Sequence, residues 1–458
     1  MVSHALALCL AAIPCPQTKV DGLDGTIPVF CDTNAVIGAD NAKSLTKIAD
    51  TPFTDGLSAV PEGRYRIPAI AAASNGVVLA IWDCRYNGSG DLPNAIDLAE
   101  STSVDSGATW SRPRIGIDVE NGGDIRKSRD IGDPCLLYDP RANRFWAMSI
   151  TGGGIRASRI GGVSANDVVL YTRGGDRDAR WEEWTGGPEG NRRSVKRMII
   201  NSLHATNRAI PVDENSIRAV FQGPGHGMVQ RQEVKDGSGQ TLMPAGTLVF
   251  PMQYLGPVTR GVRVQSVWRA FAAYSTDGGR TWRTTDLAPP EIGASQENCI
   301  VELDDGSWCM MAKFPGGGKR LFFRTNDFKR WVCDSLVQPS MKVQGSCLRV
   351  GRGEDNRSRY VCCFSTSAGR GDITLRFGRD ATADGAGITW DCGSWNIYPR
   401  TTKGYSYNSL AMIGEDILGV LFESDGRIYF RRVRLDRYSK LPIIKAKIAC
   451  TETTTCLR

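Results

Sequence analysis

The chain has 458 residues, of which 41% are hydrophobic and 23% are charged, proportions that are typical of a globular protein in water. The net charge of +7 either steers an anionic substrate toward a cleft or only keeps the protein soluble, and no basic run with interleaved aromatics indicates a nucleic-acid-binding surface. Three histidines are too few to favour a His-ligated metal site or a Ser-His-Asp triad, and the 14 cysteines contain no zinc-type pair of CxxC motifs. We therefore expect no metal and no cofactor.

Residues 1–50 are expected to form a leader segment without recognisable chemistry. The start of this segment, MVSHALALCLAAIPCPQ, has a short apolar core that fits either a secretory signal peptide or a buried first strand or helix, and it lacks a basic n-region. The first interpretation places the protein outside the cell or in the periplasm, and the second in the cytoplasm. No apolar run reaches the ~20 residues of a membrane-spanning helix.

The first chemically informative stretch runs from Tyr65 to Trp110. The β-branched run VVLAIW predicts a buried strand. Arg66 lies ahead of this strand, and Arg85 follows it with a carboxylate, Asp91, six residues later in a Gly-rich loop. Two arginines and an acid near one strand indicate a site for an anion with acid chemistry beside it.

A short polar motif recurs along the chain. SVDSGATW at 103–110 and STDGGRTW at 275–282 share the pattern S-x-D-x-G-x-T-W, and weaker copies occupy 172–181, 324–331 and 382–390. In such an Asp box the Asp accepts backbone N–H bonds, the Gly permits positive φ, and the Trp packs under the hairpin. A hairpin unit that repeats among β-rich segments, in a chain with 51 glycines, predicts an all-β β-propeller.

Three further segments lead to local expectations. Residues 231–245, a polar insertion, are expected to form a surface loop on one blade. In the strand-like run RYVCCF, Cys362 and Cys363 face opposite ways, so one is expected in the core while the other is available for a disulfide. His204 and His226 lie in polar and Gly-rich stretches and are expected to be solvated loop residues.

Taken together, these features resemble the sialidase (neuraminidase) family, whose members are six-bladed β-propellers. The resemblance covers residues 60–435 and implies a propeller within 51–440, followed by a tail at 441–458. Its motifs occur in the order of the family: YRIP at 65–68, DCRYNGSGD at 83–91, GDPCLLY at 132–138, QGPGHG at 222–227, GTLVFPMQY at 246–254, ENCIVELDDG at 297–306 and YNSLAMI at 407–413.

The resemblance implies catalytic roles for three residues. Tyr407 matches the nucleophile, Glu297 matches the carboxylate that activates it, and Asp91 matches the acid/base on a mobile loop. Tyr405 is a rival for the nucleophile because it lies on the same strand face, but the sequence Asn-Ser-Leu after Tyr407 fits the spacing of the family better.

The resemblance also implies a binding pocket. Arg66 and Arg370 match two members of the arginine triad that grips the carboxylate of sialic acid. Asp133 matches an acid that contacts polar substituents of the sugar, and Arg85 belongs to the same floor of the pocket. Glu423 matches the acid that supports Arg66.

The chain departs from the family at the middle arginine of the triad, where Lys313 stands. Lysine keeps the positive charge but cannot grip a carboxylate with two parallel hydrogen bonds. Three alternatives follow: Lys313 makes a single contact, Arg320 or Arg324 reaches into the pocket, or the ligand differs from an ordinary sialoside.

The sequence therefore predicts a retaining exo-α-sialidase, a glycoside hydrolase that releases terminal sialic acids from glycoproteins, glycolipids and oligosaccharides through a tyrosyl intermediate. The alternatives are a hydrolase for a related nonulosonic acid, a trans-sialidase, and a non-catalytic Asp-box propeller that binds glycans. The oligomeric state is not encoded in any feature we recognise.

Overall fold

The structure is a computed structural model. It describes residues 65–86, 88–118, 130–155, 166–186, 195–260, 263–289, 294–316, 319–336, 343–366, 370–398, 406–424, 426–435 and 440, and the backbone of five short strands, namely β1 (Thr18–Lys19), β2 (Thr26–Ile27), β3 (Leu45–Ala49), β10 (Arg159–Ile160) and β11 (Val163–Ser164). Most of the predicted leader, the tail at 441–458 and Tyr405 lie outside this described part.

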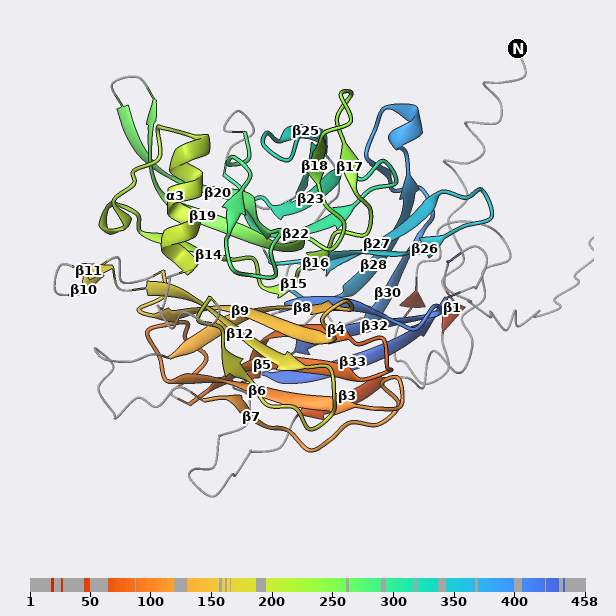
Figure 1. Ribbon diagram of the computed structural model, residues 1–458. Coiled ribbons are helices and arrows are strands. Elements are labelled where there is room, and N and C mark those ends of the chain that lie inside the picture. The colour runs from red at the N-terminus through yellow and green to blue at the C-terminus, as the bar shows by residue number, and fades with distance from the viewer. Residues whose placement is uncertain are drawn as a thin grey trace, which may run out of the picture.

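Six sheets, in each of which the successive main strands pair antiparallel, form the blades of the molecule (Figure 1). Blade 1 contains β4 (Tyr65–Ala72), β5 (Val78–Arg85), β6 (Ile96–Ser103) and β7 (Arg114–Ile117). Blade 2 contains β8 (Ile131–Asp139), β9 (Arg144–Gly152), β12 (Asn166–Gly174) and β13 (Glu182–Glu183). Blade 3 contains β14 (Ala219–Gln222), β19 (Leu248–Arg260), β20 (Arg263–Ser275) and β21 (Arg283–Thr284), and β16 (Met228–Val229) also pairs with β19.

The remaining blades follow the same order from the inner to the outer strand. Blade 4 contains β22 (Gln296–Glu302), β23 (Trp308–Lys313), β24 (Arg320–Thr325) and β25 (Val332–Leu336). Blade 5 contains β26 (Ser346–Arg352), β27 (Ser358–Ser365), β28 (Ile373–Asp380), β29 (Ile388–Thr389) and β30 (Ser394–Tyr398). Blade 6 contains β31 (Asn408–Ile413), β32 (Ile417–Ser424), β33 (Arg427–Arg434) and β3.

The inner parts of the blades contact one another in a closed ring. β4 packs against both β8 and β31, β14 against β8, β22 against β19 and β26, and β26 against β31. β3, which precedes blade 1 in the sequence, pairs antiparallel with β33 and forms the outer strand of blade 6. The sixth blade therefore combines strands from both ends of the propeller sequence. The prediction of an all-β, six-bladed β-propeller is confirmed.

The two strong Asp boxes fold into the same turn, each between the third and fourth strands of a blade. Ser103 Oγ donates to Asp105 Oδ1 at 2.8 Å, and the Thr109 backbone N–H and hydroxyl donate to Asp105 at 2.8 and 2.6 Å. In the second box, Asp277 accepts the equivalent bonds at 2.8, 2.9 and 2.6 Å. The weaker copies also join third to fourth strands, in blades 2, 4 and 5. These turns are structural devices that lie away from the inner strands.

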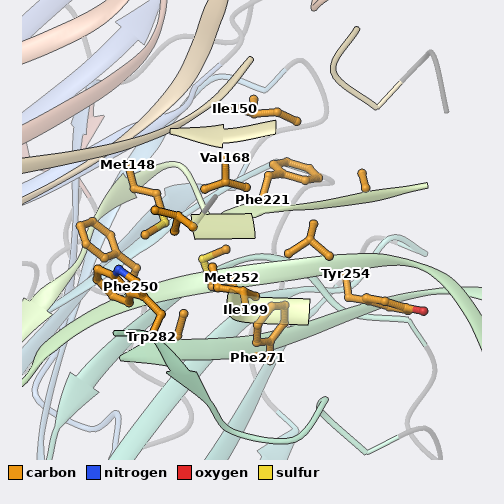
Figure 2. Close-up of a cluster of buried hydrophobic side chains, with 14 of the residues drawn as sticks. Met148, Ile150, Val168, Ile199, Phe221, Phe250, Met252, Tyr254, Phe271 and Trp282 are labelled. Atoms are coloured by element: carbon orange, nitrogen blue, oxygen red, sulfur yellow. The ribbon is translucent and has the colours of Figure 1, made fainter. Parts of the chain in front are cut away.

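Apolar side chains fill the space between neighbouring blades. Figure 2 shows the cluster between blades 2 and 3, in which side chains of β9, β12, β14, β19 and β20 converge with Ile199 and Trp282. Ile199 belongs to α3 (Val195–Thr206), which buries Val195, Ile199, Ile200 and Leu203 at helical spacing. No helix was expected in this segment.

Three local expectations need correction. Residues 231–245 include a short hairpin of β17 (Val234–Lys235) and β18 (Thr241–Met243), whose end packs into the core at Met243. Cys362 and Cys363 are both fully buried and neither forms a disulfide, because each faces one of the two blade interfaces.

The expectation of solvated loop histidines is wrong for both described residues. His204 lies in α3 with Nδ1 2.7 Å from the Ile210 carbonyl oxygen. His226 lies in β15 (Gly225–His226), a short strand that pairs parallel with β8 and contacts β4 and β31 at the centre of the ring. No helix in the described residues is both long enough and apolar enough to span a bilayer.

Candidate active site

Three of the inner strands have an irregular backbone near their first residues, at one edge of the ring. Ile67, Asp133 and Glu297 have positive φ values of 54°, 55° and 36°, and the strand register shifts beside each of them. A bulge of this kind bends the strand and re-aims a side chain out of the regular alternation. The bulges therefore turn side chains of three different blades toward the same end of the propeller axis.

Tyr407 and Glu297 meet at this edge although they are 110 positions apart. The Tyr407 hydroxyl donates to Glu297 Oε1 at 2.6 Å. The other carboxylate oxygen of Glu297 lies 2.5 Å from Lys313 Nζ, which comes from the end of β23. Blades 4 and 6 thus supply a phenol, a base and a cation in direct contact.

Arg66 joins the same group from blade 1. Its guanidinium forms two bonds with Glu423, from Nε at 2.8 Å and from Nη2 at 3.2 Å, and its Cζ lies 5.6 Å from the centroid of the Tyr407 ring. Glu423 also accepts the backbone N–H groups of Ile67 and Tyr407 at 2.9 and 3.3 Å. A buried carboxylate therefore fixes both the arginine and the backbone that carries the phenol.

A second cluster surrounds Arg85, at the end of β5. Arg85 donates to Asp83 at 2.7 and 3.1 Å and to Asp91 at 2.9 Å, and it lies 3.9 Å from Asp133. Asp91 is half exposed at the rim, whereas Asp83 is fully buried and accepts the Asp133 backbone N–H at 2.9 Å. The structure thus brings Arg85, Asp91 and Asp133 together as the resemblance implied, and Asp83 connects them.

Arg370 lies in the connection between β27 and β28, on the edge where the inner strands begin. Ser346, the first residue of β26, pairs with Cys363, and Ser365 pairs with Ile373 across the turn that carries Arg370. Within the described part of the chain the partly buried Arg370 side chain forms no hydrogen bond or ion pair.

The alternatives for the middle cation can now be separated. Arg320 is fully buried and donates to the Val343 carbonyl oxygen at 2.5 Å. Arg324 donates to the carbonyl oxygens of Gly385 and Ala386, beside the turn between β28 and β29 and away from the edge that carries Glu297. Lys313 is therefore the cation that reaches Glu297.

Burial controls the ionisation of the site. Burial, reinforced by the negative charge of Glu297, raises the pKa of Tyr407 well above its usual range, so the phenol stays neutral until a base removes its proton. Burial and the neighbouring Asp83 and Asp91 likewise raise the pKa of Asp133 well above its usual range. Burial opposes the charge of Arg66, but Glu423 outweighs it and the pKa of Arg66 is raised.

Among the described residues, no group of three or more His, Cys, Asp or Glu side chains is arranged to hold a metal ion. The arrangement instead offers an anion cradle, a neutral phenol that touches a carboxylate, and a second carboxylate at the rim. These are the elements of acid–base and nucleophilic chemistry on an anionic substrate.

Comparison with known proteins shows which proteins the chain resembles. No family model matches the chain. It is 25% identical over 388 residues to a sialidase of Bacteroides fragilis (strain YCH46), covering 81% of this chain and 62% of the relative, and 24% identical over 414 residues to a sialidase of Paraclostridium sordellii, covering 88% and 91%. A solved structure, the Hadza microbial sialidase Hz136, superimposes with a TM-score of 0.60 at 22% identity over 81% of this chain and 66% of that one. The chain is similar in sequence to these sialidases and shares the propeller fold of the solved one. It spans about three fifths of the length of the Bacteroides fragilis relative.

Sequence reasoning missed two kinds of residue in this propeller. Asp83 stands two positions before Arg85 on the same face of β5, so the D-x-R spacing was a usable signal. Gln222 and Gln253 gave no such signal, because an amide in a strand is chemically unremarkable until its partners are known.

Proposed function

We propose that the protein is a retaining exo-α-sialidase that hydrolyses terminal sialic acids through a covalent tyrosyl intermediate. The observation that carries this proposal is the 2.6 Å hydrogen bond from Tyr407 to Glu297 beside Arg66. A phenol with an unperturbed pKa near ~10 is a poor nucleophile at neutral pH, and a carboxylate in direct contact is the base that it needs.

The substrate explains the choice of a phenol. A sialoside carries a carboxylate on its anomeric carbon, and a negatively charged nucleophile would be repelled by that group. Tyr407 is neutral and only partly buried, so it can approach the substrate without this repulsion. Arg66, Arg370 and Lys313 would bind the carboxylate by charge-assisted hydrogen bonds.

The reaction would proceed in two balanced steps. In the first, Tyr407 Oη attacks the anomeric carbon while Glu297 takes the phenolic proton, and Asp91 protonates the departing glycosidic oxygen. In the second, Asp91 takes a proton from water, the resulting oxygen attacks the anomeric carbon, and Glu297 returns its proton to the departing Tyr407. Because Asp91 is bound to Arg85 at the rim, it must exchange this partner for the substrate.

Turnover of 4-methylumbelliferyl α-N-acetylneuraminide tests the proposal, with the first released anomer identified by proton NMR. We expect fluorescence to rise and the α-anomer to appear first, since two displacements retain configuration. Release of the β-anomer first would contradict a retaining mechanism. Stoichiometric binding of sialoglycans without consumption would favour the glycan-binding alternative.

Lys313 favours a second candidate within the same class of reaction. Its ammonium offers single contacts where a guanidinium offers two, and it is already engaged with Glu297. The candidate is a hydrolase or transferase for a different nonulosonic acid, such as the deaminated sugar. Activity on a panel of nonulosonides, measured with the wild type and Lys313→Arg, distinguishes this candidate from a sialidase. If Lys313 is adapted to another sugar, Lys313→Arg should lose activity on that sugar.

A further inference from the structure

Blade 3 is the one blade of the six that supplies none of the candidate site residues, yet it lies between two blades that do. Asp133 comes from blade 2, and Glu297 comes from blade 4. Both residues have positive φ, a backbone conformation that costs energy for a residue with a side chain and needs support from its surroundings.

Two buried glutamines of blade 3 contact the backbone of these two acids. Gln253, on β19, accepts the Glu297 backbone N–H on its side-chain oxygen at 3.1 Å. Gln222, at the end of β14, donates its side-chain amide to the Asp133 carbonyl oxygen. Gln222 is 0% exposed and Gln253 is 2% exposed, so water cannot replace either contact.

The two glutamines are also bound to each other. The Gln253 side-chain amide donates to the backbone carbonyl oxygen of Gln222 at 3.1 Å. A continuous chain of hydrogen bonds therefore runs from Asp133 through Gln222 and Gln253 to Glu297.

A close approach of backbones beside this chain leaves little room for adjustment. A Cβ placed on Gly223 would lie 2.4 Å from the Asn298 carbonyl oxygen, so the segment after Gln222 fits against the segment after Glu297 only without a side chain. Through this tight packing and these shared hydrogen bonds, blade 3 holds the backbones of Asp133 and Glu297 in fixed positions.

We infer that Gln253 and Gln222 are positioning residues: Gln253 sets the backbone, and hence the carboxylate, of the base Glu297, and Gln222 sets Asp133 in the subsite for the sugar. This inference rests on the proposed function. The two acids serve different purposes there, so the two glutamines should affect different kinetic parameters.

The test is steady-state kinetics of the full chain on the fluorogenic sialoside with methionine substitutions, which keep the length of the side chain and remove its amide. Gln253→Met should lower kcat by ~10- to 100-fold and leave KM within about 3-fold, because displacement of a catalytic group by a fraction of an ångström has effects of this order. Gln222→Met should raise KM by roughly 10-fold and change kcat by less than about 3-fold, because it loosens a substrate contact.

Gln230 provides a matched control. It is a buried glutamine that accepts from Trp308 Nε1 at 2.7 Å and donates to the carbonyl oxygens of Gln232 and Gly306 at 3.0 and 3.2 Å, at the opposite end of β23 from Lys313. Gln230→Met should lower the melting temperature as much as Gln253→Met and leave both kcat and KM unchanged. A purely structural role for Gln253 would make the two variants alike.

The outcomes are distinct. If Gln253→Met keeps the kcat of the wild type, or changes kinetics only as Gln230→Met does, the inference is overturned while the proposed function stands. If Gln222→Met keeps the wild-type KM, the part of the inference about Asp133 is overturned. If Gln253→Met does not fold, Gln253→Asn, whose amide is one methylene too short for both contacts, must lower kcat in its place. A wild-type protein that cleaves no sialoside overturns the proposed function and this inference with it.

Discussion

Lys313 is the residue at which this site departs most from the pattern implied by the family. Its Nζ lies 2.5 Å from the carboxylate of Glu297, the group that we propose as the base. A substrate carboxylate must share this cation with Glu297. Arg370, which has no hydrogen bond or ion pair within the described residues, faces no such competition.

Replacing Lys313 with methionine should raise KM for a sialoside by roughly 10- to 100-fold, because a charge-assisted hydrogen bond to the carboxylate is lost. Lys313→Arg should keep KM within about 10-fold of the wild type, since the charge remains. Both values come from steady-state kinetics. An unchanged KM in Lys313→Met would show that Arg66 and Arg370 alone bind the carboxylate.

Glu423 is the residue whose removal should damage both stability and binding. It is fully buried and pairs with Arg66. Glu423→Gln leaves that arginine with an uncompensated buried charge, so we expect the free energy of unfolding to fall by about 3–5 kcal/mol. Urea denaturation measures this loss. A stability equal to that of the wild type would mean that the charge of Glu423 contributes nothing to the free energy of unfolding.

The sequence indicated which residues lie together in the site better than it indicated their backbone geometry. The resemblance placed Tyr407 with Glu297, and the structure has them in contact. The positive φ of Asp133 and Glu297 could not be foreseen, because a left-handed backbone is uncommon at any residue with a side chain. Such conformations are imposed by neighbouring strands, which no local pattern encodes.

At the scale of single elements, the Asp boxes are the features that the sequence predicted best. All five lie between the third and fourth strands of a blade. In the two strong copies the hydrogen bonds of the Asp are local to the turn, so the spacing of a few residues is enough to predict the structure. Helix α3 was missed for the opposite reason. Its apolar positions 195, 199, 200 and 203 follow helical spacing, but the glycines around this segment favoured turns and strands.

The Asp boxes predict a pH dependence of stability. Slight burial acts the other way, but hydrogen bonds from Thr109 and Ser103 lower the pKa of Asp105 to about 2. The carboxylate therefore stabilises the fold fully above its unfolded pKa of ~3.9, and this contribution is lost as the pH falls toward 2.

Urea midpoints of the wild type and Asp105→Ala should differ by a constant amount above about pH 5 and converge between about pH 4 and 2. Asp277→Ala should behave in the same way, because the pKa of Asp277 is lowered by the equivalent bonds. A difference that persists undiminished at pH 2 would show that the turn does not depend on the ionised carboxylate.

At the scale of the whole molecule, the ring is closed by a strand from the beginning of the chain. β3 pairs with β33, the last strand of the propeller, and lies within the residues that the sequence analysis assigned to a leader. The five residues of β3 contain no Asp box and no clear alternation of apolar and polar residues, so the sequence did not indicate a strand there. The closure follows only from the need of blade 6 for an outer partner.

Truncation should reveal this closure. A chain that begins at residue 50 lacks β3 and should melt at least about 5 °C below the full chain, because β33 becomes an open edge. A chain that begins at residue 44 keeps β3 and serves as the control. Equal melting temperatures in thermal scans would show that β3 contributes little to the stability of the ring.

The central claim is that three of the six blades bring Arg66, Glu297 and Tyr407 to one end of the axis to form a nucleophilic site. Incubation with a 2,3-difluorinated sialic acid, followed by mass spectrometry of the digested protein, tests this claim most directly. The account predicts one sialosyl adduct, on the peptide that contains Tyr407, and no adduct in Tyr407→Phe. An adduct on any other residue, or a wild type that cleaves sialosides while Tyr407→Phe retains full activity, would contradict it.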